Sequence, residues 1–269
     1  MKLAVVGVGK LGGALLESLL EQSLFRPDEV GLIEHDLRRA QALSVRWGVK
    51  AIRLDELKDV ERILLAVKPH QFPSIAPELI HPHLGYVSTM AGIDLKTLSR
   101  RLKTDRVVRV MPNLGAIVGR SATAITAPPL AHEAGDYAFG RMLFSSVGDV
   151  YDLQEDLFDA FTGLSGSGPA YAAVFAEALS DGGVRMGLPR GLALELAAKT
   201  LIATGELLLT RPNPASLKDE VASPGGTTIA GLTELERYTF RIAAIEAVAA
   251  ATRRGREIGK GVQDIEEEC

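Results

Sequence analysis

Cysteine is nearly absent from this chain of 269 residues, since Cys269 at its very end is the only one. A single cysteine excludes an intrachain disulfide and any metal site built from several thiolates. It also fits a reducing cytoplasm. The five histidines all lie in the first half, and none has metal-ligand spacing. We therefore expect no metal site.

An excess of positive charge is also missing. The 30 Lys and Arg residues stand against 34 Asp and Glu, for a formal net charge of −4. A nucleic-acid-binding domain usually carries a basic stripe, so we expect no nucleic-acid partner. No apolar stretch has the length of a membrane span. The apolar start is interrupted by glycines and has no cleavage site of the kind that ends a signal peptide. We expect a globular protein of the cytoplasm without a membrane partner.

Short β-type runs alternate with helical patterns in the first half. Apolar residues with helical spacing predict helices over 11–22 and 37–47. Strands joined by crossover helices indicate a doubly wound parallel sheet with helices on both faces. The expected strands are 2–8, 30–34, 62–67, 85–90, 106–111, 122–127 and 147–150.

The composition changes after about residue 153, where alanine and leucine begin to dominate. The expected helices are 169–181, 189–209, 215–221, 227–238 and 239–260. We expect Gly182 and Gly183 to end the first of them. A helical domain with so many small side chains often packs against a copy of itself, so a homo-oligomer is predicted.

A glycine-rich motif joins the first expected strand to the first expected helix. Gly7-Val8-Gly9-Lys10-Leu11-Gly12 has the pattern G-x-G-x-x-G at the start of a β-α-β unit, the context that indicates dinucleotide binding. Gly7 permits the tight turn, Gly9 lets the backbone approach a pyrophosphate, and Gly12 lets helix and strand pack closely. The alternative is a tight turn without a ligand. The fold class is therefore α/β, with a Rossmann-type dinucleotide-binding domain over residues 1–153 and an all-helical domain over residues 154–269.

The end of the second expected strand bears on the choice of nucleotide. Glu34 lies about 20 residues after Gly12, where an acidic residue holds the 2′-hydroxyl of the adenosine ribose. A carboxylate there favours NADH, because it repels a 2′-phosphate. His35, Arg38 and Arg39 follow at once and could hold that phosphate, although the arginines could equally form a solvated helix face. The residues leave the cofactor as NADPH or NADH.

Two further segments end expected strands at the same edge of the sheet, where ligands of open α/β sheets bind. Lys68, in Ala66-Val67-Lys68-Pro69, is placed to contact the cofactor ribose or a substrate carboxylate, unless it is a solvated lysine at a strand end. Asn113 offers donors and acceptors to a nicotinamide amide or to substrate, or it only starts a turn.

Two glycine-rich segments of the helical half are also candidates. Ser223-Pro224-Gly225-Gly226-Thr227-Thr228 runs into an expected helix, where bare amides and two hydroxyls suit a small carboxylate. The alternative is an ordinary turn with Thr227 as the helix cap. The other segment, 162–171, contains Ser165 and Ser167, either of which can cap a helix that begins at Pro169.

These segments resemble the pyrroline-5-carboxylate reductase family. The similarity is carried by GLSGSGPAY (Gly163–Tyr171), DGGVRMGLPR (Asp181–Arg190), LKDEVASPGGTTIAGL (Leu217–Leu232), AVKP (Ala66–Pro69) and VMPN (Val110–Asn113). It covers the whole chain in order. The resemblance implies that NAD(P)H reduces the cyclic imine 1-pyrroline-5-carboxylate to L-proline, the last step of proline biosynthesis. It also implies a homodimer through the helical domain, which family members often assemble further into decamers.

The resemblance also implies roles for individual residues. Thr228 matches the threonine that the family places near the ring nitrogen, and it is the expected catalytic residue. The residues expected to cradle the substrate are Ser223, Gly225, Gly226, Thr227 and Thr228. The residues expected to bind the cofactor, from the motif and the resemblance together, are Gly7, Val8, Gly9, Lys10, Leu11, Gly12, Glu34, Ala66, Val67, Lys68, Pro69 and Asn113.

Two positions depart from the family pattern. Leu114-Gly115 follows Asn113 where the family more often has Thr-Pro, and Glu34 is less usual in a group that often prefers NADPH. The alternatives are another imine or hydroxyacid reductase of the same architecture and a non-catalytic NAD(P)H-sensing protein. Related hydroxyacid dehydrogenases have a lysine after the glycine pair of the interdomain helix, and the corresponding stretch Gly166–Ala172 has none. A cyclic imine brings its own proton, so its reduction needs mainly proximity and a carboxylate anchor.

Overall fold

Two compact units make up the chain, whose computed structural model describes residues 1–264, so that Cys269 lies outside the described part. One unit combines Met1–Ser167 with residues 249–264, and the other is Gly168–Val248. This division differs from the expected one after residue 153. Residues 154–167 and the end of the last helix pack with the sheet. That residues 1–153 bind the dinucleotide and residues 154–269 serve the substrate and dimerisation stays a prediction.

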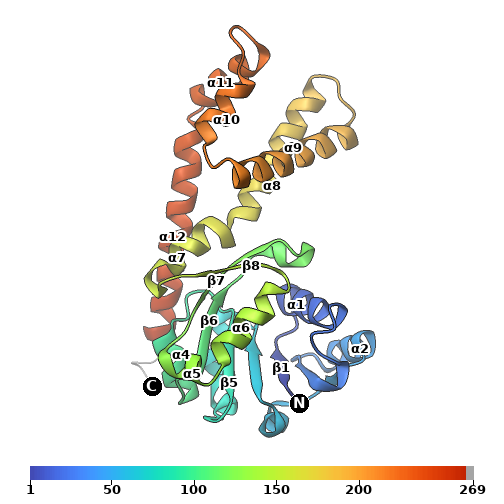
Figure 1. Ribbon diagram of the computed structural model, residues 1–269, viewed down its shortest axis with the longest axis vertical. Helices are drawn as coiled ribbons and strands as arrows, with labels where there is room; N and C mark the ends of the chain where they lie inside the picture. The colour runs from blue at the N-terminus through green and yellow to red at the C-terminus, as the bar shows by residue number, and fades with distance from the viewer. Residues whose placement is uncertain (265–269) are drawn as a thin grey trace. The chain divides into compact units, whose positions relative to one another are not determined.

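An eight-stranded sheet forms the centre of the first unit (Figure 1). Its order is β3-β2-β1-β4-β5-β6-β7-β8, so the chain leaves β1 on one side for β2 and later returns on the other side for β4. Ligands of such sheets bind at this switch point, outside the carboxyl ends of the strands. The strands are β1 Leu3–Val6, β2 Val30–Ile33, β3 Lys50–Ala51, β4 Arg62–Leu65, β5 Gly85–Ser88, β6 Val107–Met111, β7 Ser121–Thr126 and β8 Gly148–Asp152.

Helices cover both faces of this sheet, as the side chains of β1 make clear. Leu3 and Val5 belong to one hydrophobic core, and the alternate residues Ala4 and Val6 belong to the other. The first core is completed by α1 (Lys10–Glu21), α2 (Leu37–Trp47) and α6 (Asp136–Ser145). The second is completed by α3 (Phe72–Ile75) and α4 (Leu95–Leu102). The predicted doubly wound α/β fold is confirmed. Two short helices, α5 (Pro129–Glu133) and α7 (Phe158–Phe161), complete the unit.

The last two strands, β7 and β8, run antiparallel to the other six. All neighbouring strands pair in parallel except β6 and β7, which pair antiparallel through Arg109 and Thr126, among others. Only residues 112–120 join these two strands, and most of them form a 3-10 helix over Leu114–Val118. A parallel connection needs about a dozen or more residues to cross the sheet, so this segment is too short for one.

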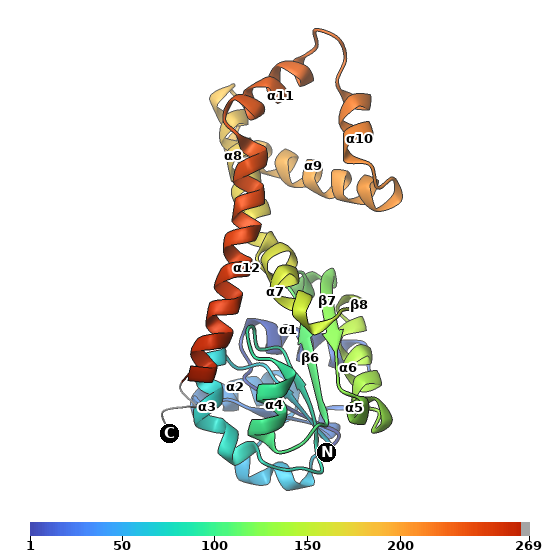
Figure 2. The same cartoon turned by 90° about the vertical axis from the view of Figure 1, so that its left-hand side faces the viewer.

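The second unit consists of helices. They are α8 (Gly168–Arg185), α9 (Arg190–Thr210), α10 (Pro214–Val221), α11 (Thr227–Arg237) and the first part of α12 (Phe240–Asp264). The last turns of α12 belong to the first unit, where Gly259 lies against Gly92 in the segment between β5 and α4 (Figure 2). The expected helical half is therefore confirmed. Among residues 1–264, no helix combines the length and the apolar character needed to span a bilayer.

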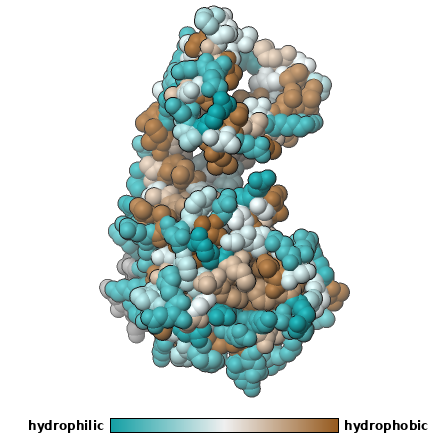
Figure 3. Space-filling view, in the orientation of Figure 1, coloured by the Kyte–Doolittle hydropathy of each residue, from teal (hydrophilic) through white to brown (hydrophobic). Residues whose placement is uncertain are grey.

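The helical unit has almost no core of its own. Only Ser180, Ala193 and Ala197 of its residues are buried. Large apolar side chains lie on its surface instead, for example Val174, at 67% exposed, and Ile202, at 62% (Figure 3). Apolar surface of this extent on a folded unit marks an interface with another molecule. The need to bury this apolar surface is a physical reason for the expected homo-oligomer.

The predicted end of α8 at Gly182 and Gly183 is wrong, because the helix continues to Arg185. Gly183 serves packing: a Cβ there would lie 3.1 Å from the Ala193 Cβ atom of α9. The helix ends at Gly187, which has φ +100. The Leu188 amide then donates to the Gly183 carbonyl at 3.0 Å, as in a Schellman motif.

Candidate functional site

The glycine-rich turn after β1 has the geometry that its three glycines predict. Gly7 has φ +89, and a Cβ there would lie 2.8 Å from Val67 Cγ1. A Cβ at Gly12 would lie 2.4 Å from the Gly7 carbonyl oxygen, so α1 can pack this closely only with a glycine. A Cβ at Gly9 would meet nothing within 4 Å. The surface at Gly9 is open, as an approaching pyrophosphate requires.

The first turn of α1 presents unpaired amides beside this open surface. Gly9 is the N-cap residue, and no side chain caps the helix. The first intrahelical bond runs from the Gly13 amide to the Gly9 carbonyl at 2.9 Å. The amides of Lys10, Leu11 and Gly12 therefore have no acceptor within the helix. Together with the positive end of the helix dipole, they fit a phosphate group.

The residues that follow β4 pack against the glycine-rich turn. The Ala66 amide donates to the Val6 carbonyl at 2.8 Å, and Val67 contacts Gly7. Lys68 is exposed, and its amide donates to the Gln71 side chain at 3.1 Å. A short 3-10 helix begins there at Pro69. The structure thus brings Ala66 and Val67 to the turn, while the role of the Lys68 ammonium group stays a prediction.

A groove of about 1040 Å³ opens at the carboxyl ends of β1 and β2. Gly7, Glu34 and Val67 are among the residues that line it. Its volume is of the order expected for a large ligand. The sequence did not point to several other residues that line the groove, namely Arg53, Leu54, Asp55, Gln71, Ser74, Ile75 and Glu78.

The charged residues of the groove form pairs. Glu34 accepts a hydrogen bond from the His35 amide at 3.0 Å and lies 3.8 Å from the Arg39 guanidinium. Arg53 donates to both carboxylate oxygens of Asp55, at 3.0 and 2.9 Å. These hydrogen bonds from Arg53 hold the pKa of the Asp55 carboxyl below its usual value. Asp55 is thus ionised at neutral pH.

Asn113 makes the turn that was one of its two expected roles. Its side-chain oxygen accepts from the Gly115 amide at 2.9 Å, and its side-chain nitrogen donates to Ser165 Oγ at 3.0 Å. A Cβ at Gly115 would lie 2.5 Å from the Arg120 carbonyl oxygen, so the departure from the family pattern fits this tight turn. Contact of Asn113 with a cofactor stays a prediction.

Ser165 belongs to a π-helical turn rather than to a loop. Residues Thr162–Gly166 form this turn between α7 and α8, and the Ser167 amide donates to the Thr162 carbonyl at 2.9 Å. The expectation that Ser165 or Ser167 caps a helix at Pro169 is wrong, because α8 begins at Gly168 directly after this helical turn. A Cβ at Gly166 would lie 3.1 Å from the Met111 methyl group, so this glycine allows the turn to approach the end of β6. Single π-turns are frequent at functional sites.

The segment Ser223–Thr228 forms a tight turn at the start of α11. The Gly226 amide donates to the Ser223 carbonyl at 3.0 Å. Pro224 precedes Gly225, which has φ +66, as a type II turn requires. A Cβ at Gly226 would come within 2.3 Å of Ser223 Oγ, so a larger residue would displace this hydroxyl.

The start of α11 itself is bare. Gly226 is its N-cap, no side chain caps it, and Thr227 is the first helical residue. The alternative of Thr227 as the cap is therefore wrong. Thr227 is exposed and Thr228 is partly buried. The amides of the first turn have no acceptor in the helix, so they and the two hydroxyls present donors suited to a carboxylate.

The predicted site residues thus form two groups. Of the cofactor group, Gly7, Glu34 and Val67 line the groove of the first unit. The other members of the glycine-rich turn and of the segment after β4 lie next to these residues in the chain, and Asn113 belongs to a separate turn. The substrate group lies at the start of α11 in the second unit. Among residues 1–264, no cluster of three or more His, Cys, Asp or Glu side chains is suited to a metal ion. The lining residues Arg53, Leu54 and Asp55 were missed because they follow β3, which has only two residues, too few for a periodic signal.

Comparison with known proteins finds similarity along the whole chain. The family model for pyrroline-5-carboxylate reductase dimerisation matches residues 155–258. A second model, for NADP oxidoreductase, coenzyme F420-dependent, matches residues 2–92. A pyrroline-5-carboxylate reductase of Thermus thermophilus is 55% identical over 260 residues, which cover 97% of this chain and 99% of that protein.

Two solved structures are similar over nearly their full length. One is the Streptococcus pyogenes 1-pyrroline-5-carboxylate reductase, with a TM-score of 0.85 and 33% identity. The other is the Plasmodium falciparum pyrroline carboxylate reductase with NADP bound, with a TM-score of 0.86 and 27% identity. Each match covers 96% of this chain and 98% of the other. The similarity therefore extends over both units.

Proposed function

The chain belongs to the pyrroline-5-carboxylate reductase family, and we propose that it reduces 1-pyrroline-5-carboxylate to L-proline with NAD(P)H. The observation that carries this proposal is the bare start of α11, where the turn Ser223–Thr228 offers amides and hydroxyls to a small carboxylate. A protein that only sensed the nucleotide would have no need of this second site. The relatives named above carry out the same reaction by name.

The groove of the first unit fits a dinucleotide. The open surface at Gly9 and the uncapped amides of α1 suit a pyrophosphate, and Glu34, which lines the groove just after β2, would hold an adenosine ribose. Ala66, Val67, Lys68 and Pro69 would border the bound nucleotide next to the glycine-rich turn. When bound, NAD(P)H supplies the hydride, and the protein supplies orientation and electrostatics.

The residues of α11 would hold the imine. The substrate carboxylate accepts hydrogen bonds from the amides of Gly225, Thr227 and Thr228, while the Gly226 amide keeps its bond to the Ser223 carbonyl, and the Thr228 hydroxyl bonds the ring nitrogen. The ring nitrogen carries its own proton as an iminium ion. Hydride addition to the C=N carbon then moves the π electrons onto nitrogen and gives the secondary amine. No protein base has to remove a proton, so positioning is the main task of these residues.

The helical domain has a second task in this proposal. Residues 154–269 join two copies into a homodimer, which further assembles into a decamer. The apolar surface of α8 and α9 supports an interface of this kind, since the unit buries so few of its own residues. The reaction takes place in the cytoplasm.

The experiment is a steady-state assay that follows the absorbance of reduced nicotinamide with pyrroline-5-carboxylate. We expect turnover by the natural chain and a loss of about 10- to 100-fold in kcat for Thr228→Ala, with the nucleotide Kd unchanged. Thr233→Ala is the matched control, because the Thr233 hydroxyl bonds only the Ile229 carbonyl of the same helix, at 2.8 Å. Folded protein that binds nucleotide but reduces no pyrroline-5-carboxylate would contradict the proposal. A screen of other imines and hydroxyacids would then identify the substrate.

A further inference from the structure

We propose that the edge of the groove next to β2 selects NADH over NADPH, with Glu34 as the specificity-determining residue and Arg39 as a residue that positions it. This inference rests on the proposed function for the reaction, but not for the binding of the nucleotide. It is carried by the way in which the charged groups after β2 are already paired.

Glu34 is held in place at the groove wall. Its side chain is 15% exposed, and one carboxylate oxygen accepts from the His35 amide at 3.0 Å. The other oxygen faces the Arg39 guanidinium at 3.8 Å. A carboxylate fixed in this way can accept hydrogen bonds from both hydroxyls of an adenosine ribose. A 2′-phosphate carries nearly two negative charges at neutral pH, and it would meet Glu34 directly.

A second carboxylate occupies the helix end that would otherwise attract a phosphate. Asp36 is the N-cap of α2, and one oxygen of its side chain accepts from the amides of Arg38 and Arg39, at 2.9 and 3.2 Å. A helix N-terminus is an anion site only while its amides are free. The start of α2 is therefore already satisfied, in contrast to the start of α1.

Arg39 is committed to groups of the protein as well. Its Nη2 donates to the Val8 carbonyl of the glycine-rich turn at 2.7 Å, while its Nε faces Glu34. The guanidinium therefore links the two segments that would hold the ribose and the pyrophosphate. A 2′-phosphate that reached Arg39 would also lie beside Glu34, the carboxylate that faces this guanidinium.

The rest of the groove carries little positive charge. Its titratable lining residues are Glu34, Asp55 and Glu78 on the acidic side and His35 and Arg53 on the basic side, and Arg53 is paired with Asp55. Neither Arg38 nor Arg39 is among the lining residues. The repulsion between two like charges in contact at a protein surface is large enough to raise a Kd more than about tenfold. Because Glu34 would repel the 2′-phosphate in this way, NAD⁺ should bind at least about tenfold more tightly than NADP⁺.

The test is direct titration of the full-length protein with NAD⁺ and with NADP⁺ by calorimetry, without any imine present. We expect the natural chain to favour NAD⁺ by about tenfold or more. Glu34→Gln should bring the ratio of the two Kd values close to one. Arg39→Met should weaken NAD⁺ without improving the preference for NADP⁺. If Arg39 instead served a 2′-phosphate, this variant would lose affinity for NADP⁺ alone.

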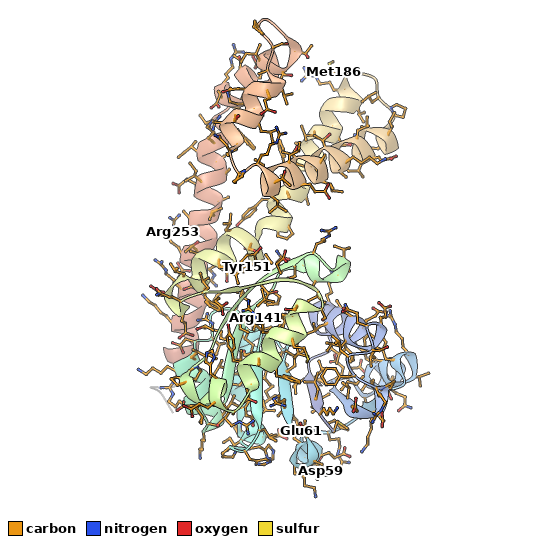
Figure 4. The ribbon with its side chains drawn as sticks, in the orientation of Figure 1. Asp59, Glu61, Arg141, Tyr151, Met186 and Arg253 are labelled. Carbon is orange, nitrogen blue, oxygen red and sulfur yellow. The ribbon has the colours of Figure 1, made fainter. Side chains whose placement is uncertain are left out.

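Glu61→Gln is the matched control, and it should leave both Kd values unchanged. Glu61 precedes β4 at the amino end of the strand, away from the groove, and it lies near Asp59 in Figure 4. Its carboxylate is 62% exposed and faces Arg62 at 3.7 Å. Equal affinity of the natural chain for the two nucleotides, or tighter binding of NADP⁺, would overturn the proposal. Tight binding of NAD⁺ without reduction of pyrroline-5-carboxylate would leave it intact and contradict only the proposed reaction.

Discussion

Alanine at Gly9 and alanine at Gly12 should separate nucleotide binding from folding. Gly9 has φ −74 and ψ −158, which any residue can adopt, and its Cβ would meet nothing within 4 Å. Alanine is a poorer N-cap than glycine, but it also restricts the unfolded chain by about 0.4–1 kcal/mol. These effects oppose each other, so Gly9→Ala should change the free energy of unfolding by less than about 1 kcal/mol.

Gly12→Ala should destabilise the protein instead. Its Cβ would lie 2.4 Å from the Gly7 carbonyl oxygen and 3.2 Å from the Ala66 Cβ atom. Both atoms belong to the packed end of the sheet, so α1 has to move away from β1 and β4. Overpacking of this kind costs about 1–3 kcal/mol or more. In a chain of this size, each kcal/mol lowers Tm by about 2–4 °C.

The variant that changes stability little, Gly9→Ala, should be the one that weakens nucleotide binding through a direct clash. The methyl group of Gly9→Ala points into the open surface that a pyrophosphate would approach, and we expect the Kd for NAD⁺ to rise by about 10- to 100-fold. The assay pairs thermal unfolding without nucleotide with calorimetric titration of NAD⁺. Natural affinity in Gly9→Ala would refute the role of this surface. A fall in Tm as large as that of Gly12→Ala would refute the packing argument.

Three further predictions concern stability and assembly. Burial raises the pKa of Tyr86 to about 12, so its part of the stability is present below pH 10 and is lost as pH rises toward 12, by up to about 2.7 kcal/mol; urea unfolding against pH should show a shallower alkaline decline for Tyr86→Phe, and identical slopes would contradict this. Asp136 is fully buried between Arg62 and Arg106, with contacts of 2.9 and 2.8 Å. Asp136→Asn should therefore lower the free energy of unfolding, measured in urea, by about 3 kcal/mol, and a loss below about 1 kcal/mol would count against the buried pairs. Ile202→Asp should lower the molar mass in analytical ultracentrifugation by placing a charge on exposed apolar surface, and an unchanged mass would exclude this face of α9 from the interface.

The sequence predicted those parts of the fold that short segments determine by themselves. The helix over Leu37–Trp47 was predicted with its observed bounds from its helical pattern, and in the structure Asp36 caps its start and Gly48, with φ +68, ends it. The turn at Gly7 followed from the spacing of three glycines in a β-α-β unit. In each case the signal and the structure lie within about a dozen residues.

The sequence failed where a distant partner decides. Gly183 and Gly187 look alike as possible ends of α8, but Gly183 packs against Ala193, and only Gly187 adopts a positive φ. The π-turn at Thr162–Gly166 has the same cause, since Gly166 approaches Met111 of β6. A glycine required by a contact between elements cannot be distinguished from a glycine at a helix end by local pattern.

The sequence also left the choice between NADH and NADPH open because it depends on contacts between distant segments, here contacts of charged groups. From the sequence, Glu34 and the neighbouring arginines are opposite charges with equal claims on the ribose site. Which charge is available to a ligand depends on the hydrogen bonds that each already makes. Arg39 donates to the Val8 carbonyl, a backbone group 31 positions earlier in the chain that no charge pattern indicates. Because Arg39 is tethered there and faces Glu34, we propose the acidic group as the one that meets the ribose.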